Sequence, residues 1–241
     1  RIILCTGRTR FKIPKDISDF EIDGLIAGNG CYIEAENHVI LDKTLSLKDC
    51  TDIVDWLTER NIGFYHNCSN KIYANETFRQ TFREVMKIYS NSKSEEELEA
   101  YLKRGFLLGA VYDQSLYRAD VEKIDYILHT QEEQEELKAR FPHLCHGQWG
   151  GVGDRSLFGD VSVPGVNKGT AIRLYEEHEN VDHRDSIGIG DALSDVPMIQ
   201  MCEIGVAMGN SPDYVKGLAD FVTNDVDQDG LFIAFKALKL I

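Results

Sequence analysis

The segment SIGIGDALSDVPM (186–198) carries two aspartates, Asp191 and Asp195, four residues apart. The apolar run that ends at Gly190 predicts a buried strand, and open α/β sheets bind ligands at the carboxyl ends of their strands. Because Asp195 lies one helical turn after Asp191, both carboxylates can face the same point. Two hard oxygen donors with room for water are typical of a Mg²⁺ site. One aspartate alone would more simply cap the following helix, but the pair at a strand end favours a metal.

Two further segments carry groups that suit a phosphoryl group. PGVNKGTAI places Lys168 in the turn before a predicted helix, ahead of the carboxylate strand. A lysine at a helix start is usually solvated, because the helix dipole disfavours a cation there, but this one could hold a phosphoryl oxygen. LCTGR places the Thr6 hydroxyl and the Gly7 amide at the end of another predicted strand, with Arg8 as a bidentate donor nearby. Taken alone, that segment fits a simple strand-to-loop turn equally well.

The predicted elements around these residues alternate between strands and helices. Towards the C-terminus, helices near 168–180 and 193–201 alternate with the strands SIGIG and IGVAM, and a strand DFV and a final helix follow. This order predicts an α/β fold with a Rossmann-like parallel sheet covered by helices on both faces. The N-terminal elements are expected in the same sheet, namely strands at 2–6 and 24–27 and a hairpin that turns at 36–37.

The middle of the chain has a different pattern. Amphipathic helices and short strands mix there without the βαβα order, and the expected strands lie at 63–68, 105–112 and 123–130. This pattern predicts an inserted α+β domain. We expect the first domain to comprise residues 1–44 and 163–241 and the inserted domain to comprise residues 45–162.

Composition limits the class of partner. The chain has 241 residues and a formal net charge of −14, which argues against nucleic acid or an anionic membrane surface as a partner. Its apolar stretches are too short for a membrane span. The six cysteines are scattered without a CxxC pair, which favours reduced thiols in a cytoplasmic protein over disulfides or a zinc site. The sequence leaves the oligomeric state open.

Taken together, these residues resemble the haloacid dehalogenase-like phosphohydrolases, and specifically their Cof-type branch with a large α/β cap. The resemblance covers nearly the whole chain. It rests on six segments in order, which are ILCTGR, IAGNG with its hairpin, GVNKG, GIGDALSDVPMI, IGVAMGNS and ADFVTNDVDQDG. One departure is Ser194, where such proteins often carry Asn, and it weakens a polar contact at most.

The resemblance implies a role for each matching residue. Thr6 would hydrogen-bond the phosphoryl group, with the Gly7 amide beside it, and Lys168 would neutralise its charge. Asp191 would ligate Mg²⁺, while Asp195 would ligate the ion or hold its water and position Lys168. The residues expected to line the substrate entrance are Arg8, Asn29 and Asn210.

The same resemblance raises an expectation about the nucleophile. In this family the nucleophile is the first Asp of a DxD motif that ends the first strand, and the second Asp protonates the leaving group. No such motif precedes Arg1, and the TGR strand is normally the second one. We therefore expect a few tens of further residues upstream, with a strand that lies between those at 2–6 and 186–190.

The expected function is a Mg²⁺-dependent phosphatase that acts on small phosphorylated metabolites, such as sugar phosphates, through an aspartyl-phosphate intermediate. The inserted domain would exclude water and recognise the leaving group. Its polar and aromatic candidates include His66, Asn67, Tyr73 and Trp149, but most such residues serve packing or lie at the surface, so none is assigned to the site. One alternative is a phosphosugar mutase of the same fold. Another is a non-catalytic protein that binds a phosphorylated ligand, if the DxD segment is truly absent.

Overall fold

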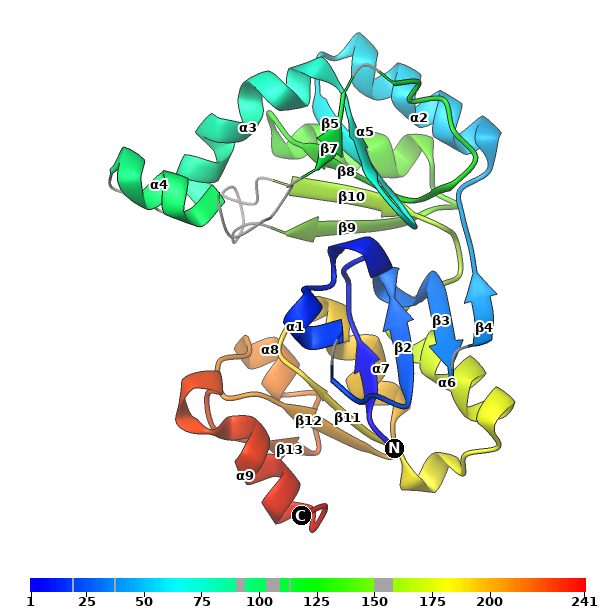
Figure 1. Ribbon diagram of the computed structural model, residues 1–241, viewed down its shortest axis with the longest axis vertical. Coiled ribbons are helices and arrows are strands. Elements are labelled where there is room, and N and C mark those ends of the chain that lie inside the picture. Colours follow the sequence, from blue (N-terminus) through cyan, green and yellow to red (C-terminus); the bar gives the residue numbers. More distant parts are fainter. Residues whose placement is uncertain (19, 37, 90–93, 103–108, 113, 150–157) are drawn as a thin grey trace. The chain divides into compact units, whose positions relative to one another are not determined.

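The computed structural model describes residues 1–18, 20–36, 38–89, 94–102, 109–112, 114–149 and 158–241. The chain divides into two compact units, whose elements are labelled in Figure 1. Unit 1 consists of Arg1–Gly7, Phe20–Asp42 and Val166–Ile241. Unit 2 consists of Arg8–Asp19 and Lys43–Gly165, so the segment 8–19, expected in the first domain, groups with the inserted residues. None of the helices in the described residues is long and apolar enough to cross a membrane.

The described strands of unit 1 form two sheets. The first sheet has the strand order β1-β2-β3-β4, with β1 parallel to β2 and the remaining pairs antiparallel. Its strands are β1 (Ile3–Cys5), β2 (Gly24–Ala27), β3 (Tyr32–Ala35) and β4 (His38–Asp42). In the second sheet all strands are parallel, in the order β11-β12-β13. Its strands are β11 (Ile187–Gly190), β12 (Ile204–Ala207) and β13 (Phe221–Val222). Among the described strands none pairs with both β1 and β11, and the further strand expected between those two from the sequence stays a prediction.

Helices cover these strands. The α-helices of unit 1 are α6 (Lys168–Glu179), α7 (Val196–Met201), α8 (Asp213–Lys216) and α9 (Gly230–Ala237). The short 3-10 turns of unit 1 are η2 (Gly28–Gly30), η4 (His183–Asp185), η5 (Leu193–Asp195) and η6 (Val226–Gln228). Helix α6 packs on β2 and β3, and the shared core includes Ile26, Ile33, Ala171 and Tyr175. The Tyr175 ring fits over Gly24, where an added Cβ would lie 2.5 Å from the ring.

Local sequence explains where α6 begins and ends. The Asn167 side chain accepts a hydrogen bond from the Thr170 amide at 2.9 Å, and the Thr170 hydroxyl accepts one from the Asn167 amide at 3.0 Å. This capping box satisfies amides that the first helical turn leaves without partners. Asn180 ends the helix in a left-handed conformation with φ 52°, which asparagine tolerates better than most residues. Lys168 is thereby fixed as the first residue of the helix.

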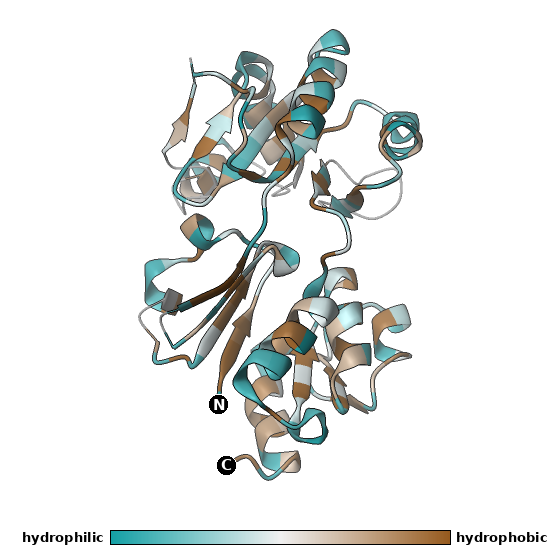
Figure 2. Cartoon of the chain, turned by 90° about the vertical axis from the view of Figure 1, so that its right-hand side faces the viewer, coloured by the Kyte–Doolittle hydropathy of each residue, from teal (hydrophilic) through white to brown (hydrophobic). Residues whose placement is uncertain are grey.

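Unit 2 is built around one sheet of described strands in the order β7-β6-β5-β8-β10-β9. Its strands are β5 (Gly63–Cys68), β6 (Ile72–Ala74), β7 (Ala110–Val111), β8 (Val121–Ile127), β9 (Cys145–Trp149) and β10 (Phe158–Ser162). The chain also forms β7 within the expected strand at 105–112, whose residues 105–108 lie outside the described residues. Figure 2 shows that apolar residues concentrate in the strands of each unit.

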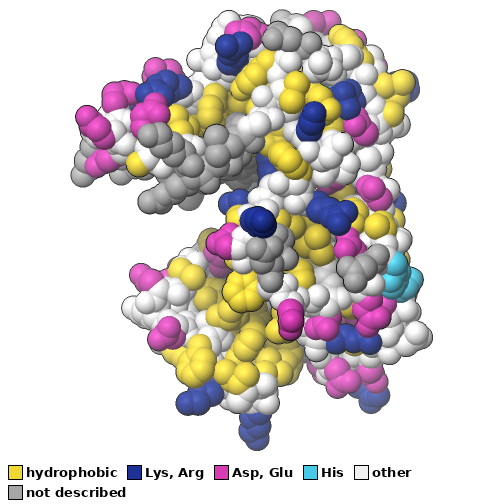
Figure 3. Space-filling model, viewed as in Figure 1, with side chains coloured by type: hydrophobic (Ala, Val, Ile, Leu, Met, Phe, Trp, Pro, Cys, Tyr) yellow, Lys and Arg dark blue, Asp and Glu magenta, His cyan; other side chains and the backbone are white. Residues whose placement is uncertain are grey.

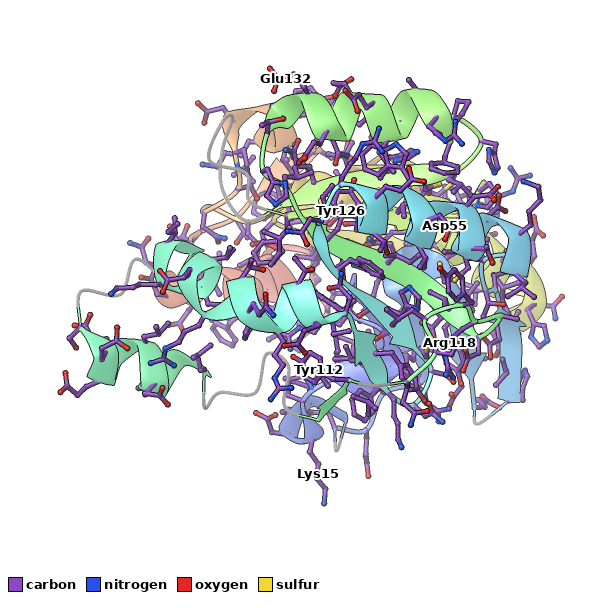
Figure 4. All side chains as sticks on the ribbon, turned by 90° about the horizontal axis from the view of Figure 1, so that it is seen from above. Lys15, Asp55, Tyr112, Arg118, Tyr126 and Glu132 are labelled. Carbon is purple, nitrogen blue, oxygen red and sulfur yellow. The ribbon has the colours of Figure 1, made fainter. Side chains whose placement is uncertain are left out.

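The helices of unit 2 are α1 (Lys15–Ser18), α2 (Leu47–Glu59), α3 (Glu76–Tyr89), α4 (Glu95–Leu102) and α5 (Gln131–Arg140), with the 3-10 turn η1 (Arg10–Lys12). Figure 4 shows Tyr126 of β8 below α5 and Asp55 on α2. The Tyr126 hydroxyl donates to Gln134 of α5 at 2.5 Å, so a buried polar contact joins that helix to the sheet. Helix α3 packs through Phe78 on Tyr65 of β5, with ring centroids 4.9 Å apart.

Candidate functional site

The end of β1 meets the turn that follows β2. The Thr6 amide donates to the Ile26 carbonyl at 2.8 Å, and the Asn29 amide donates to the Thr6 carbonyl at 3.1 Å. Asn29 holds a left-handed backbone with φ 57°, which directs its side chain against Gly7. An added Cβ at Gly7 would lie 2.9 Å from Asn29 Oδ1, and that buried oxygen has no hydrogen-bond partner among the described residues. The structure thus brings together Thr6, Gly7 and Asn29.

A buried ion pair joins two other predicted residues. The ammonium group of Lys168 donates to Oδ1 of Asp195, and each side chain is at least 93% buried. Asp195 Oδ2 accepts hydrogen bonds from the backbone amides of Asp191 and Ala192, both at 2.9 Å. Both oxygens of Asp195 are therefore engaged, one by a cation and one by the turn that carries Asp191.

Gly190 is what allows this arrangement. An added Cβ at residue 190 would lie 2.5 Å from the Asp195 Cβ and 2.7 Å from its Cγ. Real Cβ atoms do not approach so closely, so any side chain there would displace the carboxylate from Lys168 and from the turn. The glycine that ends β11 is a steric requirement of the Lys168–Asp195 pair.

Asp191 has a different environment from Asp195. Its side chain is exposed, and its Oδ2 accepts a hydrogen bond from the Asn210 side-chain amide at 3.1 Å. Asn210 Oδ1 in turn accepts from the Val226 amide at 3.3 Å, which fixes the orientation of the Asn210 side chain. The structure therefore places Asp191, which follows β11, beside Asn210, which follows β12, and the Asp191 carboxylate is accessible to solvent.

The Cys5 thiol links the two sets of residues. Burial raises the pKa of the Cys5 thiol to about 12, the Lys168 ammonium group lowers it in part, and the Asp195 carboxylate raises it. An electrostatic effect of both charges on Cys5 places the end of β1 near the Lys168–Asp195 pair.

Arg8 follows Gly7 directly in the sequence. It belongs to unit 2, where its side chain is exposed and Nη1 donates to the Lys12 carbonyl at 3.2 Å. The expectation that Arg8 lines the substrate entrance stays a prediction.

Unit 2 contains a polar cluster that the sequence analysis did not identify. Lys123 Nζ lies 3.0 Å from Asp125 Oδ1, and Lys12 Nζ lies 3.6 Å from Asp125 Oδ2. The Asn67 side-chain amide donates to Asp125 Oδ2 at 2.6 Å, and Asp160 Oδ2 lies 4.0 Å from Lys123 Nζ. We call these five residues the unit 2 polar cluster. The signal was present in β8, where Lys123 and Asp125 alternate with apolar residues and so share one face.

The cluster holds two aspartates in different electrostatic states. Burial opposes ionisation of Asp125, but the Lys123 and Lys12 ammonium groups hold the pKa of its carboxyl below the ordinary value. Burial raises the pKa of the Asp160 carboxyl and the Asp125 carboxylate raises it further, while the Lys123 ammonium group, 4.0 Å away, lowers it only in part. Asp160 lies over Gly147 of β9, where an added Cβ would be 2.6 Å from its Oδ2. The cluster can therefore present both an ionised carboxylate and a carboxyl that is protonated more readily.

Comparison with known proteins matches this chain over its whole length. The family model described as haloacid dehalogenase-like hydrolase matches residues 1–235. The chain is 26% identical to Phosphatase YwpJ of Bacillus subtilis over 258 residues, which cover 98% of this chain and 87% of YwpJ. It is also 24% identical to the 5-amino-6-(5-phospho-D-ribitylamino)uracil phosphatase YcsE of Bacillus subtilis, and that alignment covers 98% of this chain and 80% of YcsE.

Solved structures share the fold. BT1666 from Bacteroides thetaiotaomicron superposes with a TM-score of 0.79 at 23% identity and covers 100% of this chain and 82% of its own. The sugar phosphatase BT4131 superposes with a TM-score of 0.78 at 22% identity and covers 100% of this chain and 86% of its own. These likenesses confirm the predicted α/β fold.

Proposed function

We propose that this chain, which belongs to the haloacid dehalogenase-like hydrolase family and is a phosphatase, uses Mg²⁺ to hydrolyse small phosphorylated metabolites such as sugar phosphates. The names of two relatives support the substrate class, since BT4131 is a sugar phosphatase and YcsE acts on a phosphoribityl compound. The chain's own net charge of −14 would repel an anionic substrate, so local cations must bind it.

One observation carries the proposal, and it is the buried Lys168–Asp195 pair beside the strand ends. A buried ammonium group held by a carboxylate is preorganised to stabilise charge on a transferring phosphoryl group, because it needs little reorganisation during the reaction. The Thr6 hydroxyl and the Gly7 amide would donate hydrogen bonds to phosphoryl oxygens.

The donor set near Asp191 suits a hard cation. Asp191 offers an exposed carboxylate, whereas both oxygens of Asp195 are already engaged by Lys168 and backbone amides. Mg²⁺ commonly takes one or two carboxylates and keeps several waters, which fits one accessible carboxylate. We assign Asp191 as a metal ligand and Asp195 as the residue that positions Lys168. The bound ion would supply electrostatic stabilisation of the phosphoryl oxygens.

Unit 2 would act as the cap, and its polar cluster would recognise the leaving group. Its lysines donate hydrogen bonds, its aspartates accept them, and Asn67 Oδ1 has no hydrogen-bond partner among the described residues. Donors and acceptors on one sheet face match the hydroxyl groups of a sugar, each of which can donate and accept. This assignment makes the cluster the candidate for substrate selectivity.

The test uses the full-length protein with p-nitrophenyl phosphate and a panel of hexose phosphates, with Mg²⁺ present or chelated. We expect release of inorganic phosphate that needs Mg²⁺ and is faster with at least one sugar phosphate. Conversion of one hexose phosphate into an isomer without phosphate release would instead identify a mutase. Saturable ligand binding without any turnover would identify a non-catalytic binding protein.

A further inference from the structure

A separate group of metal-binding side chains lies on the surface of unit 1. His38 begins β4, while His178 and Glu179 are the last two residues of α6. Among the described residues, this is the one group of three or more histidine, cysteine or acidic side chains whose ligand atoms converge. Figure 3 shows histidine side chains together at the surface beside β4 and α6. The group shares no residue with the site at Asp191.

The spacing of its donor atoms matches a tetrahedral metal. His38 Nε2 lies 3.5 Å from His178 Nδ1 and 3.9 Å from Glu179 Oε1, and His178 Nδ1 lies 3.2 Å from Glu179 Oε1. Tetrahedral zinc, with bonds of about 2.0–2.2 Å, places neighbouring donor atoms about 3.3–3.6 Å apart. Small side-chain adjustments would therefore bring all three atoms into coordination, and the half-exposed imidazoles leave the fourth position to water.

A neighbouring residue orients the carboxylate. Arg1 Nη1 donates to Glu179 Oε2 at 2.8 Å, which leaves Oε1 directed at the two histidines. Ligating side chains in metal sites are commonly held by such an outer hydrogen bond. The Glu179 side chain is only 10% exposed, so the carboxylate is packed in place rather than free in solvent.

We propose that His38, His178 and Glu179 form a Zn²⁺ site that clips β4 to the end of α6. Two imidazoles and one carboxylate suit zinc, whereas Mg²⁺ prefers an all-oxygen set. Strand β4 ends at Asp42, where the chain leaves unit 1, and α6 begins two residues after the chain returns at Val166. The ion would tie together the two segments of unit 1 that precede and follow the longer segment of unit 2, Lys43–Gly165. This inference is independent of the proposed phosphatase mechanism.

The test titrates Zn²⁺ into tag-free full-length protein, with excess Mg²⁺ present to occupy carboxylate sites. We expect one equivalent to bind saturably and to raise the midpoint of thermal unfolding, because an ion that binds only the folded state stabilises it. Co²⁺ in place of Zn²⁺ should give the intense visible absorption of a tetrahedral site. His38→Gln and His178→Gln should each lower Zn²⁺ affinity by at least about a hundredfold, since loss of an outer-shell partner alone costs about 10–100-fold.

His129→Gln is the matched control. His129 Nδ1 lies 3.1 Å from Glu133 Oε1 in unit 2, so this pair repeats the histidine–glutamate contact. The variant should bind Zn²⁺ like the wild type. Zn²⁺ binding that survives in both His38→Gln and His178→Gln would overturn the proposal, as would a weak, six-coordinate Co²⁺ spectrum. Absence of saturable binding to the wild-type protein would overturn it as well.

Discussion

The Lys168 ammonium group and the Asp195 carboxylate form a buried ion pair that joins the first residue of α6 to the residue before α7. The same carboxylate binds the backbone amides of the turn that carries Asp191. A buried charge without its partner is strongly destabilising, so neither residue can be lost without consequence for the other. The pair therefore couples the position of the Lys168 ammonium group to that of the turn that carries Asp191.

Lys168→Ala should lower kcat by roughly a hundredfold or more, with a smaller change in KM, because the lost cation matters most where charge is concentrated in the transition state. Steady-state kinetics with Mg²⁺ measure both constants. Lys236→Ala, at an exposed lysine of unit 1, is the control and should behave like the wild type. A raised KM with unchanged kcat would show that Lys168 serves only ground-state binding.

Asp191→Asn should preserve the fold, because the side chain is exposed, and should raise the Mg²⁺ concentration needed for half-maximal activity. Turnover measured across a Mg²⁺ series separates weaker metal binding from a loss of catalysis at saturation. Asp213→Asn removes an exposed carboxylate from the first turn of α8 and should leave the Mg²⁺ dependence unchanged. An unaltered Mg²⁺ dependence in Asp191→Asn would contradict the metal assignment.

Gly190→Ala should reduce activity sharply without removing any functional group. The added methyl would lie 2.5 Å from the Asp195 Cβ, so the carboxylate must move away from Lys168. Gly217→Ala is the matched control, since its Cβ would meet no atom closer than 3.4 Å and its φ of −69° suits alanine. Comparable kinetics for the two variants would show that the position of Asp195 is unimportant.

Asp160→Asn should change selectivity among sugar phosphates more than it changes hydrolysis of p-nitrophenyl phosphate. Asparagine has nearly the size of the Asp160 carboxyl, so the packing over Gly147 should persist. It is also neutral, and burial already raises the pKa of the carboxyl that it replaces. The measurement is kcat/KM over the substrate panel. Asp120→Asn, at a half-exposed carboxylate paired with Arg118, is the control. Equal losses on every substrate would refute a role for the unit 2 polar cluster in leaving-group recognition.

His66 should make the protein sensitive to acid. Burial, aided by the Arg118 charge, lowers the pKa of His66 to about 4 from an ordinary value near 6.5. Between pH 6.5 and pH 4 the His66 imidazole is protonated in the unfolded chain but not in the folded protein. Lowering the pH through this range therefore lowers the free energy of unfolding, by up to about 3 kcal/mol. Urea denaturation at pH 7 and pH 4.5 should therefore show a smaller loss in His66→Phe than in the wild type.

The control for that comparison is His129→Phe, at a histidine whose side chain is 47% exposed, which should lose as much stability as the wild type. An equal loss in His66→Phe would mean that the buried imidazole is not the group that titrates.

The sequence by itself determined the fold class and the residues at the strand ends. Apolar runs that end at Gly190 and Thr6 predicted strands, and side chains that follow parallel strands converge at one edge whatever the details of packing. For that reason Thr6 and Asp191 could be proposed as site residues from local patterns, and the family segments in the same order added Lys168. Capping signals such as Asn167 likewise act within a few residues.

Only the tertiary structure decided which atoms meet across distant segments. It directs both oxygens of Asp195 to Lys168 and to backbone amides, and it separates the strands of unit 1 into two described sheets. It also gathers the unit 2 polar cluster from four separate segments, and it brings His38 to the end of α6. Such contacts depend on how strands and helices pack, and residues 27 to 140 positions apart carry no local pattern that records their approach.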